Sequence, residues 1–166
     1  LSSERARWSQ RFSTGNIRKT YIAMVHGRPP NAGELADPLY DRRRRSLLPA
    51  HTYYETGICF WDTAQLICQP LTGRKHQIRR HLANIEHPII GDPRYGISDT
   101  QRASIGSVLH AEDVAADVCA SLSIRPRLWL HALRLETDTQ CYESAVPEAF
   151  ELFVDVLAAR DEQIAD

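Results

Sequence analysis

The chain has 166 residues, of which 43% are hydrophobic, and this length and composition are typical of one globular domain with a buried core. No apolar run approaches the roughly 20 residues that a membrane-spanning helix needs, so we expect no membrane segment. The net charge of −1 conceals two halves of opposite sign: residues 1–102 carry a formal charge of +7 and residues 103–166 a formal charge of −8. The basic half can bind a polyanion, although chance segregation of solvated charge explains it equally well.

The four cysteines show neither CxxC nor metal-finger spacing. We therefore expect no metal site, and a reducing, cytoplasm-like compartment. The chain begins at Leu1, and its one methionine is Met24. We interpret it as part of a longer protein.

The first half of the chain predicts mostly strands. A helix around Trp8 and Phe12 precedes a strand over 17–27, whose two faces are both apolar, as in a central strand. A short extended piece follows over 34–39. The four arginines of 42–45 lie in a predicted loop, and contact with RNA and simple solvation explain them equally well. Two strands over 51–59 and 64–70 have hairpin spacing.

A helix is predicted over 74–85, with Thr72 as its N-cap. Arg79 borders the expected apolar stripe, so its side chain should be partly buried and should need a carboxylate partner. Arg80 lies opposite the stripe and should be free in solvent or on a phosphate. The stripe is formed by Ile78, Leu82 and Ile85.

The second half predicts a turn-rich loop over 87–96, a helix over 111–122, and strands over 127–137 and 142–146. A last helix begins at Pro147, with Phe150, Phe153, Val154 and Leu157 inside. The pattern favours an α+β fold, with a mixed, mostly antiparallel sheet and flanking helices, in one domain over 1–166.

One segment carries most of the chemistry. Residues 72–79, TGRKHQIR, form an arginine-rich helix start, which favours anions but no particular reaction. This segment and the HPIIGD of 87–92 resemble the RluA/TruC-type RNA pseudouridine synthases, with the TruC-type tRNA enzymes closest. Further matching segments are KTYIA at 19–23, YG at 95–96, LHA at 130–132 and LSSE at 1–4.

The resemblance implies isomerisation of a uridine in RNA to pseudouridine, with tRNA favoured over rRNA as partner. It implies no cofactor, metal or nucleotide. It also implies a curved mixed sheet with an RNA cleft across its middle, of which this chain supplies the C-terminal portion. The strand over 17–27 is therefore expected to have an unfilled edge.

The resemblance also implies roles for individual residues. Tyr21 matches the tyrosine that lies against the target uracil and takes the proton from its C5, although a core aromatic residue is the simpler reading without the motif. Arg79 matches the arginine that pairs with the catalytic aspartate. The implied substrate-binding residues are Arg74, Lys75 and Arg80 on phosphates, His76 and Gln77 in orienting the loop, and Ile78 in the apolar wall of the uracil pocket.

The chain contains no HRLD segment, which supplies the catalytic aspartate in that family. We therefore expect the 166 residues alone to be inactive. An alternative is a non-catalytic RNA-binding scaffold, and a third reading is a structural domain with an incidental basic face. Asp92 lies in a turn and is expected to fix the loop. The other carboxylates that we considered, Glu34, Asp37, Asp41, Glu55 and Asp62, also lack the HRLD context.

Overall fold

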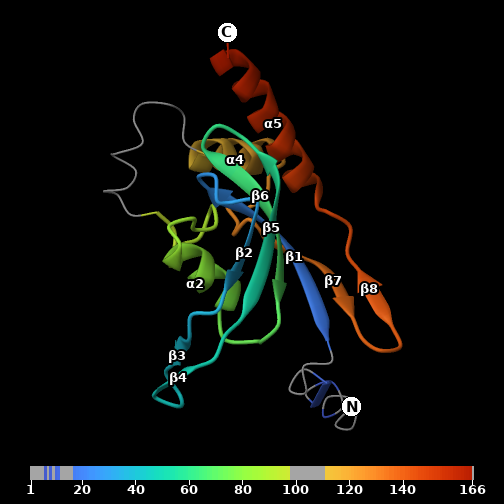
Figure 1. Cartoon of the computed structure of the whole chain (residues 1–166). Coiled ribbons are helices and arrows are strands. Elements are labelled where there is room, and N and C mark those ends of the chain that lie inside the picture. Colours follow the sequence, from blue (N-terminus) through green and yellow to red (C-terminus); the bar gives the residue numbers. More distant parts are fainter. Residues whose placement is uncertain (1–5, 7, 9, 12–16, 98–110, 166) are drawn as a thin grey trace.

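The computed structural model describes residues 6, 8, 10, 11, 17–97 and 111–165. In this part of the chain, six strands form an antiparallel sheet in the order β2-β5-β6-β1-β7-β8, and β3 and β4 form a separate hairpin that projects at the lower left of Figure 1. The α+β prediction with a mostly antiparallel sheet is confirmed. The elements are β1 (Arg18–His26), β2 (Ala32–Leu35), β3 (Leu39–Asp41), β4 (Ser46–Leu48), β5 (Thr52–Cys59), β6 (Thr63–Pro70), α2 (Gln77–Asn84), α4 (Ala111–Ser121), β7 (Leu130–Glu136), β8 (Cys141–Glu143) and α5 (Glu148–Ala165).

Strand β1 is central, as its two apolar faces predicted. Residues 22–25 are each at most 5% exposed, and β1 pairs with β6 on one side and with β7 on the other. The expected unfilled edge on this strand is wrong, because β7 returns from the far end of the chain to pair there. Among the described strands, the sheet ends instead at β2 and β8.

Most other elements appear where the sequence predicts them. The hairpin of β5 and β6 and the strand pair β7 and β8 are confirmed, the latter two in shorter form. The extended piece over 34–39 is divided, because Pro38 lacks the N–H group that a continuous ladder needs. Its first part joins the sheet as β2, and its end begins β3. The expected helix around Trp8 and Phe12 falls largely outside the described residues.

The aromatic core joins α5 to the segment before β7. Trp129, Phe150 and Phe153 are at most 1% exposed, and the Trp129 ring lies 5.1 Å from Phe150 and 4.3 Å from Phe153 between centroids. Helices α4 and α5 lie together at the top of Figure 1, whereas α2 lies lower, on the side of the β3–β4 hairpin. The two ends of the molecule are therefore covered by different helices.

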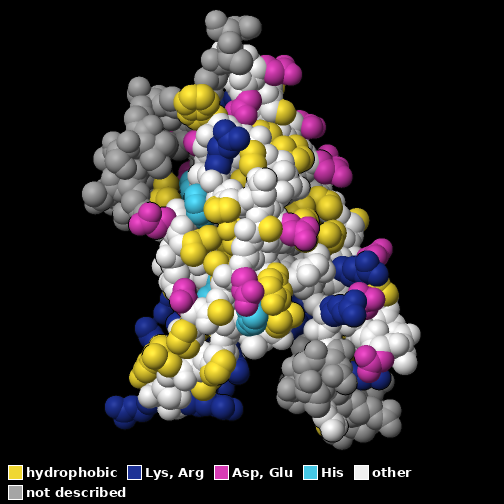
Figure 2. Space-filling model, viewed as in Figure 1, with side chains coloured by type: hydrophobic (Ala, Val, Ile, Leu, Met, Phe, Trp, Pro, Cys, Tyr) yellow, Lys and Arg dark blue, Asp and Glu magenta, His cyan; other side chains and the backbone are white. Residues whose placement is uncertain are grey.

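The charges are separated in space as well as in sequence. Figure 2 shows Lys and Arg side chains gathered around the projecting hairpin, whereas Asp and Glu side chains line the region of α5. Part of the basic half thus gathers around the hairpin, on the side of α2, while other Lys and Arg side chains lie beside acidic ones at the right of Figure 2. None of the helices among the described residues is long and apolar enough to cross a membrane.

Candidate functional site

The TGRKHQIR segment enters α2 through a loop. The helix begins at Gln77, three residues later than predicted, and its N-cap is His76, with a φ of 55° and no side-chain cap. The prediction that Thr72 caps the helix is wrong. Thr72 Oγ1 accepts the N–H of His51 and donates to Gln77 Oε1 at 2.7 Å, and Gln77 Oε1 also accepts the N–H of Arg74 at 2.9 Å. The Gln77 amide thus folds 72–76 as a loop instead of a helical turn.

A buried chain of hydrogen bonds continues from that amide. Gln77 Nε2 donates to Thr52 Oγ1 at 3.0 Å, and Thr52 Oγ1 lies 3.0 Å from His81 Nδ1. His81 Nε2 lies 3.0 Å from the carbonyl oxygen of Asp37, which can only accept, so Nε2 carries the proton. Burial lowers the pKa of His81, which keeps the ring neutral. This series of hydrogen bonds ties the TGRKHQIR loop to the segment from which the β3–β4 hairpin begins.

Arg79 has the carboxylate partner that its position beside the apolar stripe requires. Its Nε and Nη2 donate to Asp92 Oδ2 and Oδ1 at 2.8 and 2.7 Å. Asp92 Oδ1 also accepts the N–H groups of Arg94 and Tyr95, both at 2.9 Å. Burial raises the pKa of Asp92, but these hydrogen bonds outweigh it and hold the pKa below its usual value. Asp92 therefore fixes its loop, as predicted, and also orients Arg79, a role that sequence reasoning missed.

Buried neighbours fix the position of Asp92. Ile89 and Ile90, both fully buried, tie the loop to β1 through a bridge between Val25 and Ile89 and a 2.9 Å hydrogen bond from Ile90 N to Met24 O. The loop is thus anchored to the central strand of the sheet. This anchoring places the Asp92 carboxylate beside α2.

A pocket of about 250 Å³ lies where β1, α2 and β7 meet. Six of the eight predicted site residues line it: Tyr21, Arg74, His76, Gln77, Ile78 and Arg79. Lys19 and Leu130 line it too, and each belongs to a matching segment, which is the signal that could have identified them. Burial raises the pKa of Tyr21, so its phenol is protonated at neutral pH.

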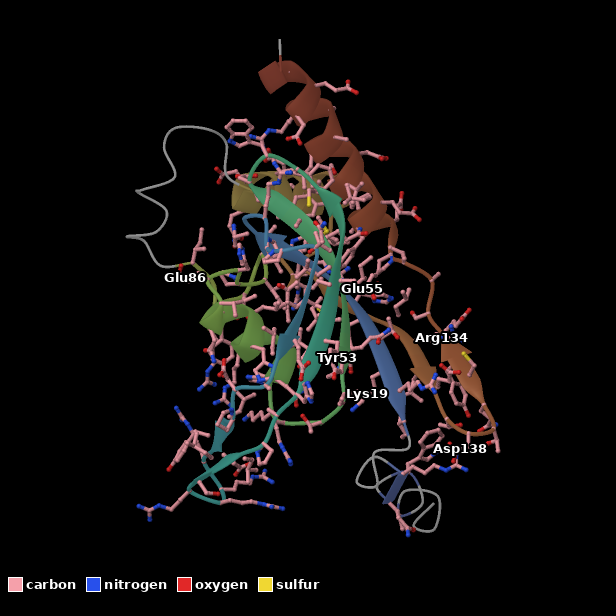
Figure 3. All side chains as sticks on the ribbon, in the orientation of Figure 1. Lys19, Tyr53, Glu55, Glu86, Arg134 and Asp138 are labelled. Carbon is pink, nitrogen blue, oxygen red and sulfur yellow. The ribbon has the colours of Figure 1, made fainter. Side chains whose placement is uncertain are left out.

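Lys19 comes from the N-terminal part of β1 (Figure 3) and forms part of the pocket wall. Its ammonium group donates to the carbonyl oxygen of Thr72 at 3.1 Å, and burial lowers its pKa. This contact ties the TGRKHQIR loop to β1, on which Tyr21 also lies. The loop is thereby held over the pocket from the sheet side.

The two remaining predicted residues, Lys75 and Arg80, lie outside this pocket. They line a second hollow, a groove of about 620 Å³ beside the β3–β4 hairpin, and Arg74 lines both hollows. The prediction that Arg80 is free in solvent is wrong. Its side chain is half-buried and donates to the carbonyl oxygen of Tyr40 at 3.2 Å, because the hairpin lies over this face of α2.

The sequence shows clear relatives. Residues 2–84 match the family model described as RNA pseudouridylate synthase. The chain is 35% identical over 159 residues to tRNA pseudouridine synthase C of Salmonella typhimurium, covering 82% of this chain and 55% of that protein. It is 34% identical over 114 residues to the dual-specificity RNA pseudouridine synthase RluA of Escherichia coli, covering 62% and 52%. The chain therefore spans only about half the length of these curated relatives.

Solved structures show the same fold. The structure of human RNA pseudouridylate synthase domain containing 4 superposes with a TM-score of 0.72 at 24% sequence identity, over 95% of this chain and 69% of that one. Human RNA pseudouridylate synthase domain containing 1 superposes with a TM-score of 0.60 at 21% identity. At these identities the likeness shows the fold alone.

Proposed function

Because this chain belongs to the RNA pseudouridylate synthase family, we propose that it is part of a catalytic domain that isomerises uridine in RNA to pseudouridine. The observation that carries the proposal is the pocket in which Tyr21, Ile78 and Arg79 meet. We further propose tRNA as the substrate class. The relative named tRNA pseudouridine synthase C matches 82% of this chain, against 62% for the dual-specificity relative.

The pocket suits a flat, uncharged base. The Tyr21 ring and the apolar side chains of Ile78 and Leu130 form walls against which a uracil can lie. The base must first leave its stack in the RNA. The reaction then breaks the bond between N1 and C1′, turns the uracil in the pocket, joins C5 to C1′ and removes the proton from C5. Tyr21 is the proposed acceptor of that proton. Its phenol is protonated at neutral pH, so the hydroxyl must pass its own proton on as it accepts the one from C5. N1, which is freed when its bond to C1′ breaks, takes up one proton in the product, so no proton is gained or lost overall.

Arg79 is the proposed partner of the catalytic aspartate, which a segment outside these 166 residues would supply. A guanidinium group has five N–H donors, and two of them are bound to Asp92. The other three have no acceptor among the described residues, and a second carboxylate at the ribose is proposed to accept from them. His76 and Gln77 are proposed to hold the loop, and Lys75 to act at the RNA backbone. Arg74 and Arg80 are proposed to act there indirectly, since they donate to the backbone carbonyls of Pro49 and Tyr40 beside it.

The proposed location is the cytoplasm. All four cysteines are free, and Cys59 and Cys141 are exposed at the surface. Exposed thiols persist in reducing compartments, of which the cytoplasm is one. Labelling of the cysteines in intact cells would test the compartment independently of activity.

The decisive experiment measures pseudouridine in tRNA without modifications, after incubation with the complete protein. We expect one uridine to be converted, and Arg79→Ala to abolish the conversion. Arg125→Ala, which removes an exposed arginine outside the pocket, is the matched control and should retain it. If the complete protein binds tRNA yet leaves every uridine unchanged, it is the RNA-binding scaffold instead.

A further inference from the structure

The groove beside the pocket is lined mainly by positively charged side chains. It lies between the β3–β4 hairpin and α2, holds about 620 Å³, and includes a single carboxylate, that of Asp41, among its lining side chains. A hollow lined by one sign of charge concentrates counter-ions strongly. The six cationic side chains that line it are Arg42, Arg43, Arg74, Lys75, Arg80 and Arg94.

The one carboxylate is engaged by the backbone of the hairpin itself. Asp41 Oδ1 accepts the N–H of Arg44 at 2.8 Å and the N–H of Arg43 at 2.9 Å. These contacts, that with Arg44 foremost, hold the pKa of Asp41 below its usual value. The carboxylate thereby shapes the turn from which the arginine side chains of 42–45, all exposed, extend.

Two arginines from the TGRKHQIRR segment hold the hairpin in place. Arg80 Nη1 donates to the carbonyl oxygen of Tyr40 on β3 at 3.2 Å, and Arg74 Nε donates to the carbonyl oxygen of Pro49, just after β4, at 2.9 Å. A third attachment is the buried hydrogen bond of His81 to the Asp37 carbonyl before β3. The hairpin is thus attached to the α2 segment at three backbone carbonyls, on both of its sides.

The groove and the pocket adjoin. Arg74 lines both of them. Tyr95 lines the groove, and its ring lies 5.1 Å from the Arg79 guanidinium and its hydroxyl 3.3 Å from His76 Nδ1, two residues of the pocket wall. An RNA strand with one nucleotide in the pocket can therefore place neighbouring nucleotides in the groove, among its cations.

We propose that the β3–β4 hairpin is an RNA-binding arm, and that the groove holds the phosphodiester backbone of nucleotides that flank the target uridine. Arg42, Arg43, Lys75 and Arg94 contact phosphates. Arg74 and Arg80 are positioning residues, which hold the arm against α2. This inference rests on the proposed function and deepens it. The ligand is a phosphodiester chain because six cationic side chains line one groove and because guanidinium groups match phosphate oxygens two at a time.

The test compares two double variants with the same change in net charge. Binding of unmodified tRNA is measured by fluorescence anisotropy between 50 and 200 mM salt. Arg42→Ala with Arg43→Ala should lower the salt slope by about two, because each lost phosphate contact lowers it by about 0.9. The control, Arg28→Ala with Arg125→Ala, removes exposed arginines outside the groove and should change it little. Equal slopes in the two variants would overturn the proposal.

A second variant should change the affinity for tRNA in the opposite direction. Asp41→Asn keeps an oxygen that accepts the N–H groups of Arg43 and Arg44 but removes the negative charge from the groove. It should bind tRNA more tightly than the wild type, by several-fold at low salt. Weaker binding by this variant would count against the groove as the phosphate site.

The positioning role of Arg80 is tested by a double-mutant cycle. Arg80→Ala should weaken binding less in the Arg42→Ala, Arg43→Ala background than in the wild type, because it acts through the arm. Strictly additive losses would overturn this role.

Kinetic measurements distinguish failure of the proposed arm from failure of the proposed reaction. In the complete protein, Arg42→Ala with Arg43→Ala should raise KM for tRNA about tenfold or more and leave kcat at saturation within about threefold. A wild-type protein that forms no pseudouridine would overturn the proposed function, while the binding slopes still decide the arm. An unchanged KM and salt slope in an active protein would overturn the arm alone.

Discussion

Arg79 and Asp92 face each other in a two-point ion pair, with Nε–Oδ2 and Nη2–Oδ1 distances of 2.8 and 2.7 Å. The Asp92 side chain is fully buried, and that of Arg79 is 15% exposed. The ring of Tyr95 lies against the guanidinium from another side, 5.1 Å from its centre. The pair thus fixes the plane of the guanidinium at the wall of the pocket, while its other three N–H groups donate to no side chain or carbonyl in the described part of the chain.

Replacing Arg79 by lysine tests whether this orientation matters beyond the charge. Lysine keeps the charge but cannot reproduce two parallel hydrogen bonds to Asp92. We expect Arg79→Lys in the complete protein to lower kcat for pseudouridine formation by about 10²-fold or more, with tRNA affinity within about threefold. Single-turnover assays with saturating protein measure both. Activity near that of the wild type would mean that charge alone suffices.

Removing the Arg79 side chain should also lower stability. Arg79→Ala leaves the Asp92 carboxylate buried without its counter-ion, although the N–H groups of Arg94 and Tyr95 remain. We expect the free energy of unfolding to fall by about 3 kcal/mol at neutral pH. Urea unfolding measures this loss. The double variant with Asp92→Asn should recover part of it, since no buried charge then lacks a partner.

A variant of Tyr21 can distinguish its role in binding the base from its role in proton transfer. Tyr21→Phe keeps the ring in the pocket but removes the hydroxyl group. If the hydroxyl accepts the C5 proton, this variant should bind tRNA normally and lose about 10²-fold or more in kcat. Substrate deuterated at C5 should then react measurably more slowly in the variant, because proton removal has become limiting. Full activity of Tyr21→Phe would restrict the role of Tyr21 to packing against the base.

His81 predicts a dependence of stability on pH. Its pKa is lowered in the folded protein and is about 6.5 in the unfolded chain, so the unfolded state binds the proton more readily. The stabilisation is fully present above about pH 6.5 and is lost as the pH falls toward the folded-state pKa. His81→Gln retains a donor for the Asp37 carbonyl but does not titrate. Its free energy of unfolding should fall less between pH 7.5 and 5.5, and parallel curves for the two proteins would contradict the prediction.

Gly91 should not tolerate a side chain. Its φ is +69°, and a Cβ atom would run into the carbonyl oxygen of Arg127. Its N–H also donates to the Glu112 carboxylate at 3.0 Å. We expect Gly91→Ala to cost about 3 kcal/mol or more in unfolding free energy. Gly73→Ala is the matched control, since a Cβ there has no neighbour within 4 Å, and it should change stability by about 1 kcal/mol at most.

Much of the fold follows from local pattern. The run of apolar residues on both faces of 17–27 predicted a central strand, because only a strand covered on both sides can bury both sets of side chains. The i, i+4, i+7 stripe predicted which face of α2 is buried, and the position of Arg79 beside it predicted the need for a carboxylate. These inferences succeed because they depend on the periodicity of one element and on the cost of burying an unpaired charge.

The sequence alone thus determined the family resemblance, the central strand, the buried stripe of α2 and the half-buried state of Arg79. Only the tertiary structure decided that Asp92 is the partner of Arg79, that Thr72 belongs to a series of hydrogen bonds instead of a helix cap, and that Arg42 and Arg43 line one groove with Arg80 of α2. Each of these depends on contacts between elements distant in sequence. Such contacts are fixed by the packing of the whole sheet, with Ile89 and Ile90 against β1 and the hairpin carbonyls against Arg74 and Arg80.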